Sequence, residues 1–246
     1  MSESEAKMAT NKSTFIPLLL FLILIPQANT LPNCNGQIQH IMTSSSDRAD
    51  TIRQELQQAE IIPTVIDDFV PSLSLSISWT KTSQEASLGN TLKPDDLQGV
   101  PVVSVKPLVP NQQSETNIVI VATDPDAPQR DDPKWAEFCH WIAVSSGSGS
   151  EEDGKEMKLD DVIEYKPPGP PKKTGKHRYV FLGLVPGNGT TDKLELSKPG
   201  ERKRWGYDKE EGEGSRVEGV RRWARENGLV VIGKSFCSFQ PGENAD

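Results

Sequence analysis

The chain of 246 residues is long enough for one medium domain with appendages. Hydrophobic residues make up 35% of it, which supports a globular core but excludes a protein with many membrane spans. The formal net charge of −8 disfavours nucleic acid and anionic membranes as partners. We therefore expect no nucleic-acid partner, and any phosphate has to be bound locally, in a pocket rather than on a basic face.

The first thirty residues have the pattern of a targeting segment. The apolar run Phe15–Pro26 follows two lysines, leads into small or polar residues, and is too short to span a bilayer comfortably. This order is typical of a secretory signal peptide, with cleavage expected near Ala28 or Thr30. The sequence thus predicts a signal peptide over 1–30 and a secreted protein. Delivery to the vacuole, or membrane anchoring by an uncleaved signal, is the alternative.

The three cysteines leave at least one thiol unpaired in an exported chain. A disulfide between Cys34 and Cys237 would tie the mature N-terminus to the last strand and leave Cys139 free, although the sequence does not fix the pairing. Asn188 begins an Asn-Gly-Thr glycosylation sequon, which predicts an exposed loop there.

Hydrophobic periodicity then predicts the elements in chain order. A loose segment over 31–47 precedes a helix at Arg48–Ile61, which Pro63 ends. A second helix is expected at Arg216–Asn227, closed by Gly228 in the left-handed conformation. Strands are expected between them and after the second helix, at Leu73–Trp79, Val100–Lys106, Asn117–Thr123, Cys139–Ser145, Asp161–Lys166, Arg178–Val185 and Leu229–Gln240.

The stretch 145–158 is rich in Gly, Ser and charged residues, which predicts a flexible surface insertion. The seven expected strands, with a helix near each end, predict one mainly-β domain over 48–246.

An apolar strand ends abruptly in the run Thr123-Asp-Pro-Asp-Ala-Pro. Proline has no N–H and fixes φ, so the strand ladder has to stop here. Asp124 and Asp126 are expected to point the same way from a rigid, polar lip. Taken alone, these six residues favour an ordinary turn over a ligand site.

Two of the three histidines shift that balance. His140 lies at the start of an expected strand, and His177 lies at the mouth of another, after a proline-rich loop that begins at Pro167. One histidine is usually structural, but two histidines and Asp124 at strand ends beside stiff loops favour a polar pocket. Imidazole N–H groups, a phenol O–H and loop N–H groups are suitable donors to a phosphate. Asp124 would fix the tautomer of a neighbouring histidine or hold an ammonium group.

The runs DPDAP, DPKW, EFCHW and PPGPPKKTGKHRYVF, in this order and spacing, resemble the phosphatidylethanolamine-binding protein family. Within it, WAEFCH, the upstream LGNTL and the downstream RWGY make the chain most similar to the fungal carboxypeptidase Y inhibitor branch. The resemblance covers roughly Thr51–Gln240.

This resemblance implies a mainly-β fold with a large central sheet, a smaller second sheet and flanking N- and C-terminal helices. It also implies a shallow pocket for phosphate-like anions such as a phosphoethanolamine head group. Phe138 would take the place of an aromatic lid that is often Trp in the family, and Phe236 or Phe239 could form the roof. The expected ligand-binding residues are Asp124, Asp126, Phe138, His140, Gly169, Pro171, His177 and Tyr179.

The resulting hypothesis is a monomeric, non-enzymatic protein without cofactor or metal. It binds a phosphate-bearing small ligand or phospholipid head group, with a serine carboxypeptidase as a candidate partner. One alternative is a head-group or signalling-partner binding module that inhibits no protease. A hydrolase using Asp124, Asp126, His140 and His177, with or without a metal, is a second, although no G-x-S-x-G turn supplies a nucleophile. A secreted structural protein with a vestigial pocket is a third.

Overall fold

The structure, a computed structural model, describes residues 44–108, 117–145, 155–205 and 218–239. All of them belong to the compact unit Met42–Asp246. The expected signal peptide, Cys34, most of the expected insertion and the side chain of Cys237 lie outside the described residues. In the part of the chain that is described, neither helix combines the length and the apolar character needed to cross a membrane.

The first helix, α1 (Ser45–Gln58), begins three residues before the predicted start, because Ser44 caps it. The Ser44 hydroxyl accepts from the Asp47 N–H at 3.2 Å, and the Asp47 carboxylate accepts from the Ser44 N–H at 3.1 Å. This capping box satisfies two backbone donors that a helix start leaves open. The predicted end was also wrong: Ala59 is the C-cap and Glu60 has φ 54°, so the helix ends before Pro63 acts.

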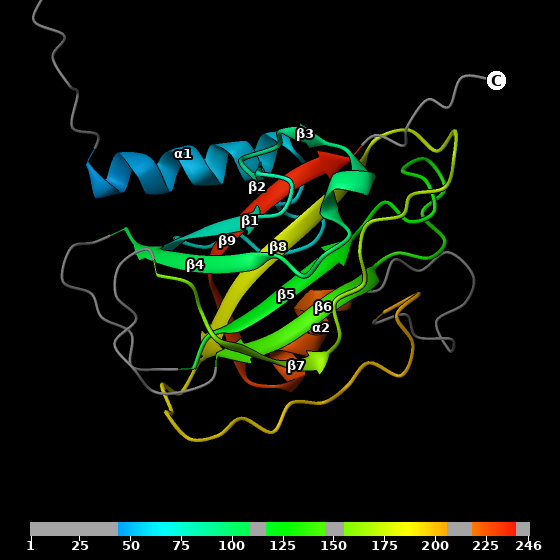
Figure 1. Ribbon diagram of the computed structural model, residues 1–246. Coiled ribbons are helices and arrows are strands. Elements are labelled where there is room, and N and C mark those ends of the chain that lie inside the picture. Colours follow the sequence, from blue (N-terminus) through cyan, green and yellow to red (C-terminus); the bar gives the residue numbers. More distant parts are fainter. Residues whose placement is uncertain (1–43, 109–116, 146–154, 206–217, 240–246) are drawn as a thin grey trace, which may run out of the picture. The chain divides into compact units, whose positions relative to one another are not determined.

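Nine strands and a second helix follow within the described residues (Figure 1). The helix α2 (Gly219–Glu226) ends as predicted before Gly228, which has φ 64°. All seven predicted strands are present, the first with the predicted ends and the other six with shifted ends, whereas β2 and β3 are too short to show a periodic signal. The strands are β1 (Leu73–Trp79), β2 (Gln84–Ala86), β3 (Thr91–Leu92), β4 (Val102–Pro107), β5 (Val119–Asp124), β6 (Phe138–Ser145), β7 (Leu159–Ile163), β8 (His177–Pro186) and β9 (Leu229–Phe239).

The strands form one sheet with a large part (β9, β8, β5, β6 and β7) and a small part (β1, β2 and β4). The two parts meet between β1 and β9. The sheet order is β2-β1-β9-β8-β5-β6-β7, with β4 paired to β1 and β3 paired to β9. β1 meets β9 in parallel only at Leu73–Gly233 and Ser74–Lys234. A Cβ at Gly233 would lie 2.9 Å from the Leu73 carbonyl oxygen, so this junction requires glycine. The predicted mainly-β fold, with a large central sheet and flanking helices, is confirmed.

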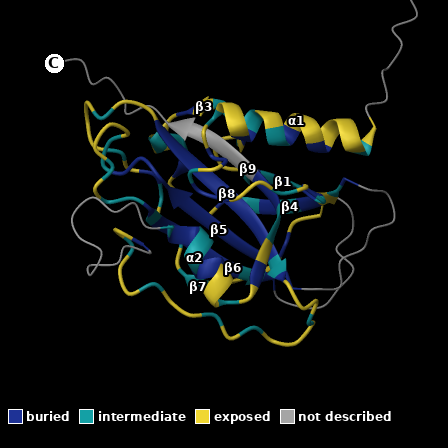
Figure 2. Cartoon of the chain, turned by 180° about the vertical axis from the view of Figure 1, so that it is seen from behind, coloured by how far each residue is buried: buried dark blue, intermediate teal, exposed yellow. Residues whose placement is uncertain are grey.

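Alternating residues of the central strands build two cores on opposite faces. From β5, Ile120 faces the core shared with β1 and β4, while Val119 and Val121 face the core shared with the two helices. α2 contributes Trp223 to the second core, and the buried central strands contrast with the exposed outer side of α1 (Figure 2). Each fully buried aliphatic side chain stabilises the fold by roughly 1.5–3 kcal/mol. The strand ends between these cores are therefore rigid supports for side chains.

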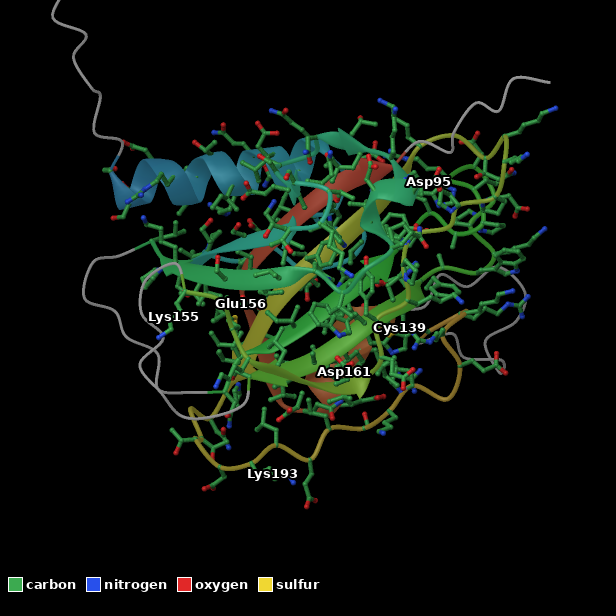
Figure 3. The ribbon with its side chains drawn as sticks, in the orientation of Figure 1. Asp95, Cys139, Lys155, Glu156, Asp161 and Lys193 are labelled. Carbon is green, nitrogen blue, oxygen red and sulfur yellow. The ribbon has the colours of Figure 1, made fainter. Side chains whose placement is uncertain are left out.

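The two ends of the expected insertion belong to the folded part. Ser145 is the last residue of β6, Met157 is buried, and Glu156 forms a bridge with Ser104 of β4. Asp161, labelled in Figure 3, lies in β7. Its carboxylate accepts from the Trp141 indole N–H at 2.7 Å. Within 145–158, residues 146–154 lie outside the described ranges.

Candidate ligand-binding site

Asp124 ends β5 as a buried carboxylate with a hydrogen-bond partner on each oxygen. One oxygen accepts from the Asp126 backbone N–H at 2.7 Å, and the other lies 2.9 Å from His177 Nδ1. Asp124 and His177 are only 2% and 1% exposed, so this contact is shielded from solvent. A carboxylate is an acceptor when ionised, so it holds the proton of His177 on Nδ1. The predicted role of Asp124 in fixing a histidine tautomer agrees with this geometry.

A β-bulge points His140 into the same region. β5 and β6 pair Ala122 with Trp141 but Thr123 with Cys139, which leaves His140 as the extra residue. Because of this shift, Cys139 and Trp141 face different cores although they are two positions apart. The bulge lets the His140 ring lie 4.7 Å from that of Phe138. Bulges commonly re-aim a side chain in this way beside binding sites.

His140 is a neutral acceptor rather than a donor toward the site. Its Nδ1 lies 2.7 Å from the Lys166 carbonyl oxygen, so Nδ1 carries the proton. Burial lowers the pKa of His140 to about 3, against the raising effect of that hydrogen bond. Nε2 of a neutral imidazole is then a lone-pair acceptor. In this neutral form His140 offers the site a lone pair rather than the N–H that was expected to donate to an anion.

His177 is held on both sides of its ring. Its Nε2 lies 2.9 Å from the Thr174 hydroxyl, which is also 2.7 Å from the Pro171 carbonyl oxygen. A hydroxyl donates once, so its proton goes either to the Pro171 carbonyl oxygen or to His177 Nε2. Burial raises the pKa of Asp124, and the His177 contact opposes that rise.

Tyr179 completes the inner wall. Its ring centroid lies 4.7 Å from that of His140, and its hydroxyl interacts with the Asp124 carboxylate and the backbone of Gly169. Burial raises the pKa of Tyr179 well above its ordinary value, and the neighbouring Asp124 charge adds to the rise. The phenol therefore stays protonated and remains a hydrogen-bond donor at neutral pH.

These side chains surround a cavity of about 200 Å³ at the ends of β5, β6 and β8. Asp126 does not line it. The predicted residues that do line it are Asp124, Phe138, His140, Gly169, Pro171, His177 and Tyr179. The cavity is smaller than the 300–1,000 Å³ typical of sites for drug-sized ligands, and suits a compact head group.

Asp126 instead forms a buried ion pair with Arg178. Its carboxylate accepts from Arg178 Nε at 2.9 Å, from Nη2 at 2.6 Å and from the Arg178 backbone N–H at 2.8 Å. The prediction that Asp126 points with Asp124 assumed continued strand alternation. β5 ends at Asp124, whose side chain binds the Asp126 N–H in a local turn, so the alternation stops.

Trp135, Lys166 and Lys203 also line the cavity and are not among the predicted ligand-binding residues. The segment Glu201–Trp205 runs beside the start of β6, with the Cys139 N–H donating to the Arg202 carbonyl at 2.8 Å. This contact brings Lys203 to the mouth, where its Nζ lies 4.0 Å from the centroid of the Trp135 ring. Trp135 lies in the DPKW run that supports the family resemblance. Nothing in the sequence connects Lys203 with the distant segment that contains Trp135 and His140.

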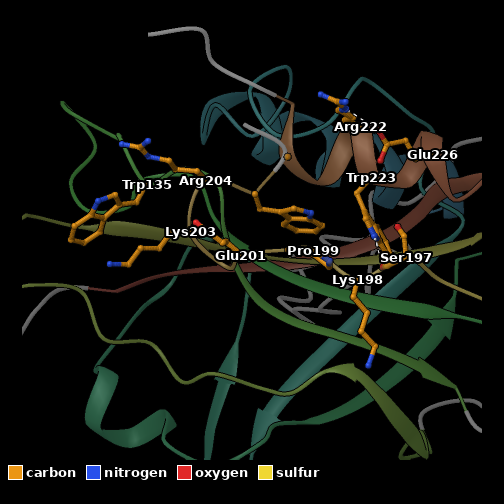
Figure 4. Close-up of a pocket in the computed structure, with 13 residues that line it drawn as sticks. Trp135, Ser197, Lys198, Pro199, Glu201, Lys203, Arg204, Arg222, Trp223 and Glu226 are labelled. Carbon is orange, nitrogen blue, oxygen red and sulfur yellow. Dashed lines mark hydrogen bonds and ion pairs between the residues drawn. The ribbon is translucent and has the colours of Figure 1, made fainter. Parts of the chain in front are cut away.

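A larger cavity of about 730 Å³ shares Trp135 and Lys203 with the small one (Figure 4). Its two arginines are already engaged: Arg222 pairs with Glu226 at 2.8 Å, and Arg204 Nε donates to the Lys134 carbonyl. Buried titratable groups converge only on the small cavity of the two, so we assign the candidate site there.

Two further expectations for the described residues concern a metal and the cysteine Cys139. Among these residues no group of three or more His, Cys, Asp or Glu side chains could hold a metal ion. Cys139 is free, as predicted, but it is buried, and burial raises the pKa of its thiol to about 12. The expected roof is untested, because the side chains of Phe236 and Phe239 lie outside what the structure describes.

The fold and the cavity together define a curled β-sheet protein with a small polar pocket at the ends of its central strands. A sequence model described as phosphatidylethanolamine-binding protein matches residues 82–231. The carboxypeptidase Y inhibitor of Saccharomyces cerevisiae is 31% identical over 223 residues, covering 79% of this chain and 97% of the inhibitor. The chain therefore belongs to the phosphatidylethanolamine-binding protein family, as its motifs predicted.

Solved structures of this family have the same fold as this chain. A crystal structure of carboxypeptidase Y inhibitor complexed with its cognate proteinase matches with a TM-score of 0.65 and 28% identity, covering 79% of this chain and 97% of that one. A phosphatidylethanolamine-binding protein from Plasmodium vivax, 22% identical, shares the fold with a TM-score of 0.56, over 77% of this chain and 97% of that one. These relatives are named as binding proteins and an inhibitor, in agreement with the prediction that this chain is not an enzyme.

Proposed function

We propose that the protein binds a small phosphate-bearing ligand, such as a phosphoethanolamine head group, in the 200 Å³ cavity. The observation that carries this proposal is the separation of charge along the cavity. Asp124 and the Tyr179 hydroxyl lie at its base, while the exposed cations Lys166 and Lys203 lie at its mouth. A zwitterion with an anionic and a cationic end matches this polarity.

The chemistry of the walls limits the affinity. His140 offers a lone pair rather than an N–H, so phosphate donors come from Lys166, Lys203 and loop N–H groups. The proline-rich wall Pro167–Pro171 is pre-ordered, which lowers the entropic cost of binding. A few charge-assisted hydrogen bonds, less the cost of association, correspond to a Kd of roughly micromolar to millimolar.

An NMR titration with phosphate and with O-phosphorylethanolamine tests the proposal. We expect amide shifts at His140, His177 and Tyr179. O-phosphorylethanolamine should bind more tightly than phosphate, because the negative charge of Asp124 attracts its ammonium group but repels an anion that carries no positive charge. Lys203→Met is expected to raise the Kd about 3- to 10-fold, since one exposed charge contact contributes about 1 kcal/mol. The matched control is Lys198→Met, which lines the larger cavity only.

Absence of shifts at these residues up to about 10 mM ligand would sink the proposal. Equal weakening by Lys198→Met would also count against it, because that result reports general surface charge rather than the cavity.

A second candidate function is inhibition of a serine carboxypeptidase. Its support is the alignment over 97% of the yeast carboxypeptidase Y inhibitor, together with the 0.65 TM-score to such an inhibitor in complex with its proteinase. Inhibition and head-group binding are compatible, because a protein surface and a small pocket can act independently.

We expect the secreted form to reduce the activity of a serine carboxypeptidase at nanomolar to micromolar concentration. Peptide hydrolysis is measured against protein whose N-terminus has been established by mass spectrometry, since an N-terminal segment that contacts its target has to be free. Lys203→Met serves as the control and is expected to inhibit equally well if the head-group pocket lies outside the contact. Full activity of several such enzymes at about 10 µM protein would remove this function.

We also propose a secreted monomer whose signal peptide over 1–30 is removed, with vacuolar delivery or an uncleaved anchor as the alternatives. The same mass spectrum would report the cleavage site and the oxidation state of Cys34 and Cys237.

A further inference from the structure

The turn that follows β8 carries the Asn188-Gly-Thr sequon, which is not part of the proposed head-group pocket. The Gly189 N–H donates to the Pro186 carbonyl at 3.0 Å and closes a tight turn. Gly189 has φ 69°, which favours glycine at this position. The Gly187 N–H donates to the Gly228 carbonyl at 2.8 Å and fixes the turn to the residue before β9. The sequon therefore lies in a turn with a defined conformation.

Asn188 has an exposed side chain whose nitrogen is not engaged. Its Oδ1 accepts from the Thr190 backbone N–H at 3.1 Å, a local turn that asparagine side chains commonly form. In the described part of the chain no hydrogen bond uses Asn188 Nδ2. The backbone thus holds the amide oxygen, and the amide nitrogen remains without a role in the fold.

The rest of the loop is held by contacts that do not involve the Asn188 side chain nitrogen. The Thr190 hydroxyl donates to the Asp192 carboxylate at 3.1 Å and accepts from the Asp192 N–H at 3.2 Å. Asn117 Nδ2 donates to the Asp192 carbonyl at 2.7 Å and anchors the loop to the start of β5. Asn188 belongs to neither hydrophobic core. A bulky group on Asn188 Nδ2 would therefore break no contact of the folded protein.

The turn is remote from the head-group pocket. His177, the first residue of β8, lines the pocket, whereas the turn begins at Pro186, the last residue of β8. A strand of ten residues, at about 3.3 Å per residue, spans about 30 Å. In Figure 1 the loop before β8 and the turn after it lie at opposite ends of this strand. A substituent on Asn188 leaves the mouth of the pocket free.

We propose that Asn188 is an attachment site for an N-linked oligosaccharide, which the Asn-x-Thr pattern directs in an exported chain. The donor is an oligosaccharide linked to a lipid pyrophosphate. A bond forms between Asn188 Nδ2 and the anomeric carbon of the first sugar, while the bond from that carbon to the pyrophosphate oxygen breaks. The electron pair of the broken bond leaves with the pyrophosphate, Nδ2 loses one proton, and nothing is oxidised or reduced. The inference rests on the proposed export of the chain and not on either proposed binding function.

The exported form has a single site of this kind. The other Asn-x-Ser/Thr run of the sequence begins at Asn11, within the signal peptide that we propose is removed. An exported protein therefore carries one N-linked oligosaccharide or none, and its intact mass distinguishes the two.

Mass spectrometry of the full chain secreted by a eukaryotic host tests the assignment. Peptide-N-glycosidase, which cleaves N-linked oligosaccharides, should lower the mass by one oligosaccharide and leave a carboxylic acid at position 188. Asn188→Gln and Thr190→Ala are expected to abolish this mass difference, whereas Thr190→Ser keeps the hydroxyl and should retain it. The matched control is Thr191→Ala, which removes an exposed hydroxyl one residue beyond the sequon and should also retain the oligosaccharide.

A second form, in which an established secretory signal replaces residues 1–30, separates the site from export. If this form is secreted with Asn188 unmodified, the assignment is overturned, as it is by an oligosaccharide that persists in Asn188→Gln. If this form is modified but the full chain stays inside the cell, the proposed signal peptide fails and the assignment of Asn188 stands. The mass does not depend on head-group binding or on carboxypeptidase inhibition, so either function can fail without the modification.

Discussion

We expect Asp126→Ala to lower the free energy of unfolding by about 3–5 kcal/mol, because it leaves the Arg178 guanidinium buried without its counter-charge. Arg178 and Asp126 side chains are 6% and 1% exposed, and the pair is bidentate. The same guanidinium donates to the Ala59 and Glu60 carbonyls, so the pair ties the turn after β5 to the end of α1. Urea denaturation monitored by fluorescence measures the effect.

The control is Asp67→Ala. The Asp67 carboxylate lies 3.3 Å from Arg221 Nε, and the Asp67 side chain is 75% exposed. A surface pair of this kind contributes about 0–1 kcal/mol. The double variant Asp126→Leu/Arg178→Met should recover part of the loss, since an apolar replacement removes both charges together. If Asp126→Ala cost no more than Asp67→Ala, the buried pair would not support the turn as we infer.

The residues of the pocket could be predicted where a proline or a proline-rich loop marks the end of a strand. Proline after Asp124 ends a strand at that residue, and His177 follows a stiff loop at the mouth of another, so both lie at the same end of the sheet. Their 2.9 Å contact also needs β5 and β8 to be antiparallel neighbours, a pairing that the structure shows and the sequence did not specify.

Other features depend on tertiary structure that no local pattern encodes. The orientation of His140 arises from one extra residue in β6 relative to β5, and a bulge has no signature in the run EFCHW. Lys203 reaches the mouth because the Arg202 carbonyl accepts from the Cys139 N–H, a contact between distant segments. Asp126 was assigned to the ligand because alternation was extended past the end of a strand. A buried arginine partner in β8 competes for that carboxylate and determines its direction.

We expect Lys234→Met to stabilise the protein by on the order of 2–4 kcal/mol below pH 7, with the gain fading toward pH 10.5. The pKa of Lys234 is about 7 in the folded protein, against 10.5 for an ordinary lysine. Between these values the unfolded chain holds more protons than the folded one, so this lysine makes stability rise with pH. Below pH 7 both states are protonated, and the folded protein bears the net cost of keeping this charge away from water, after the opposing effect of Glu55.

The measurement is urea denaturation of the parent, Lys234→Met and Lys81→Met across pH 6, 8 and 10, with the variants compared at each pH because other groups titrate in common. The free energies of unfolding of the parent and of Lys81→Met, a control at an exposed lysine, should change with pH in the same way. The difference in free energy of unfolding between the parent and Lys234→Met should become smaller as pH rises. A difference that is constant with pH would mean that Lys234 is already charged and compensated in the folded state.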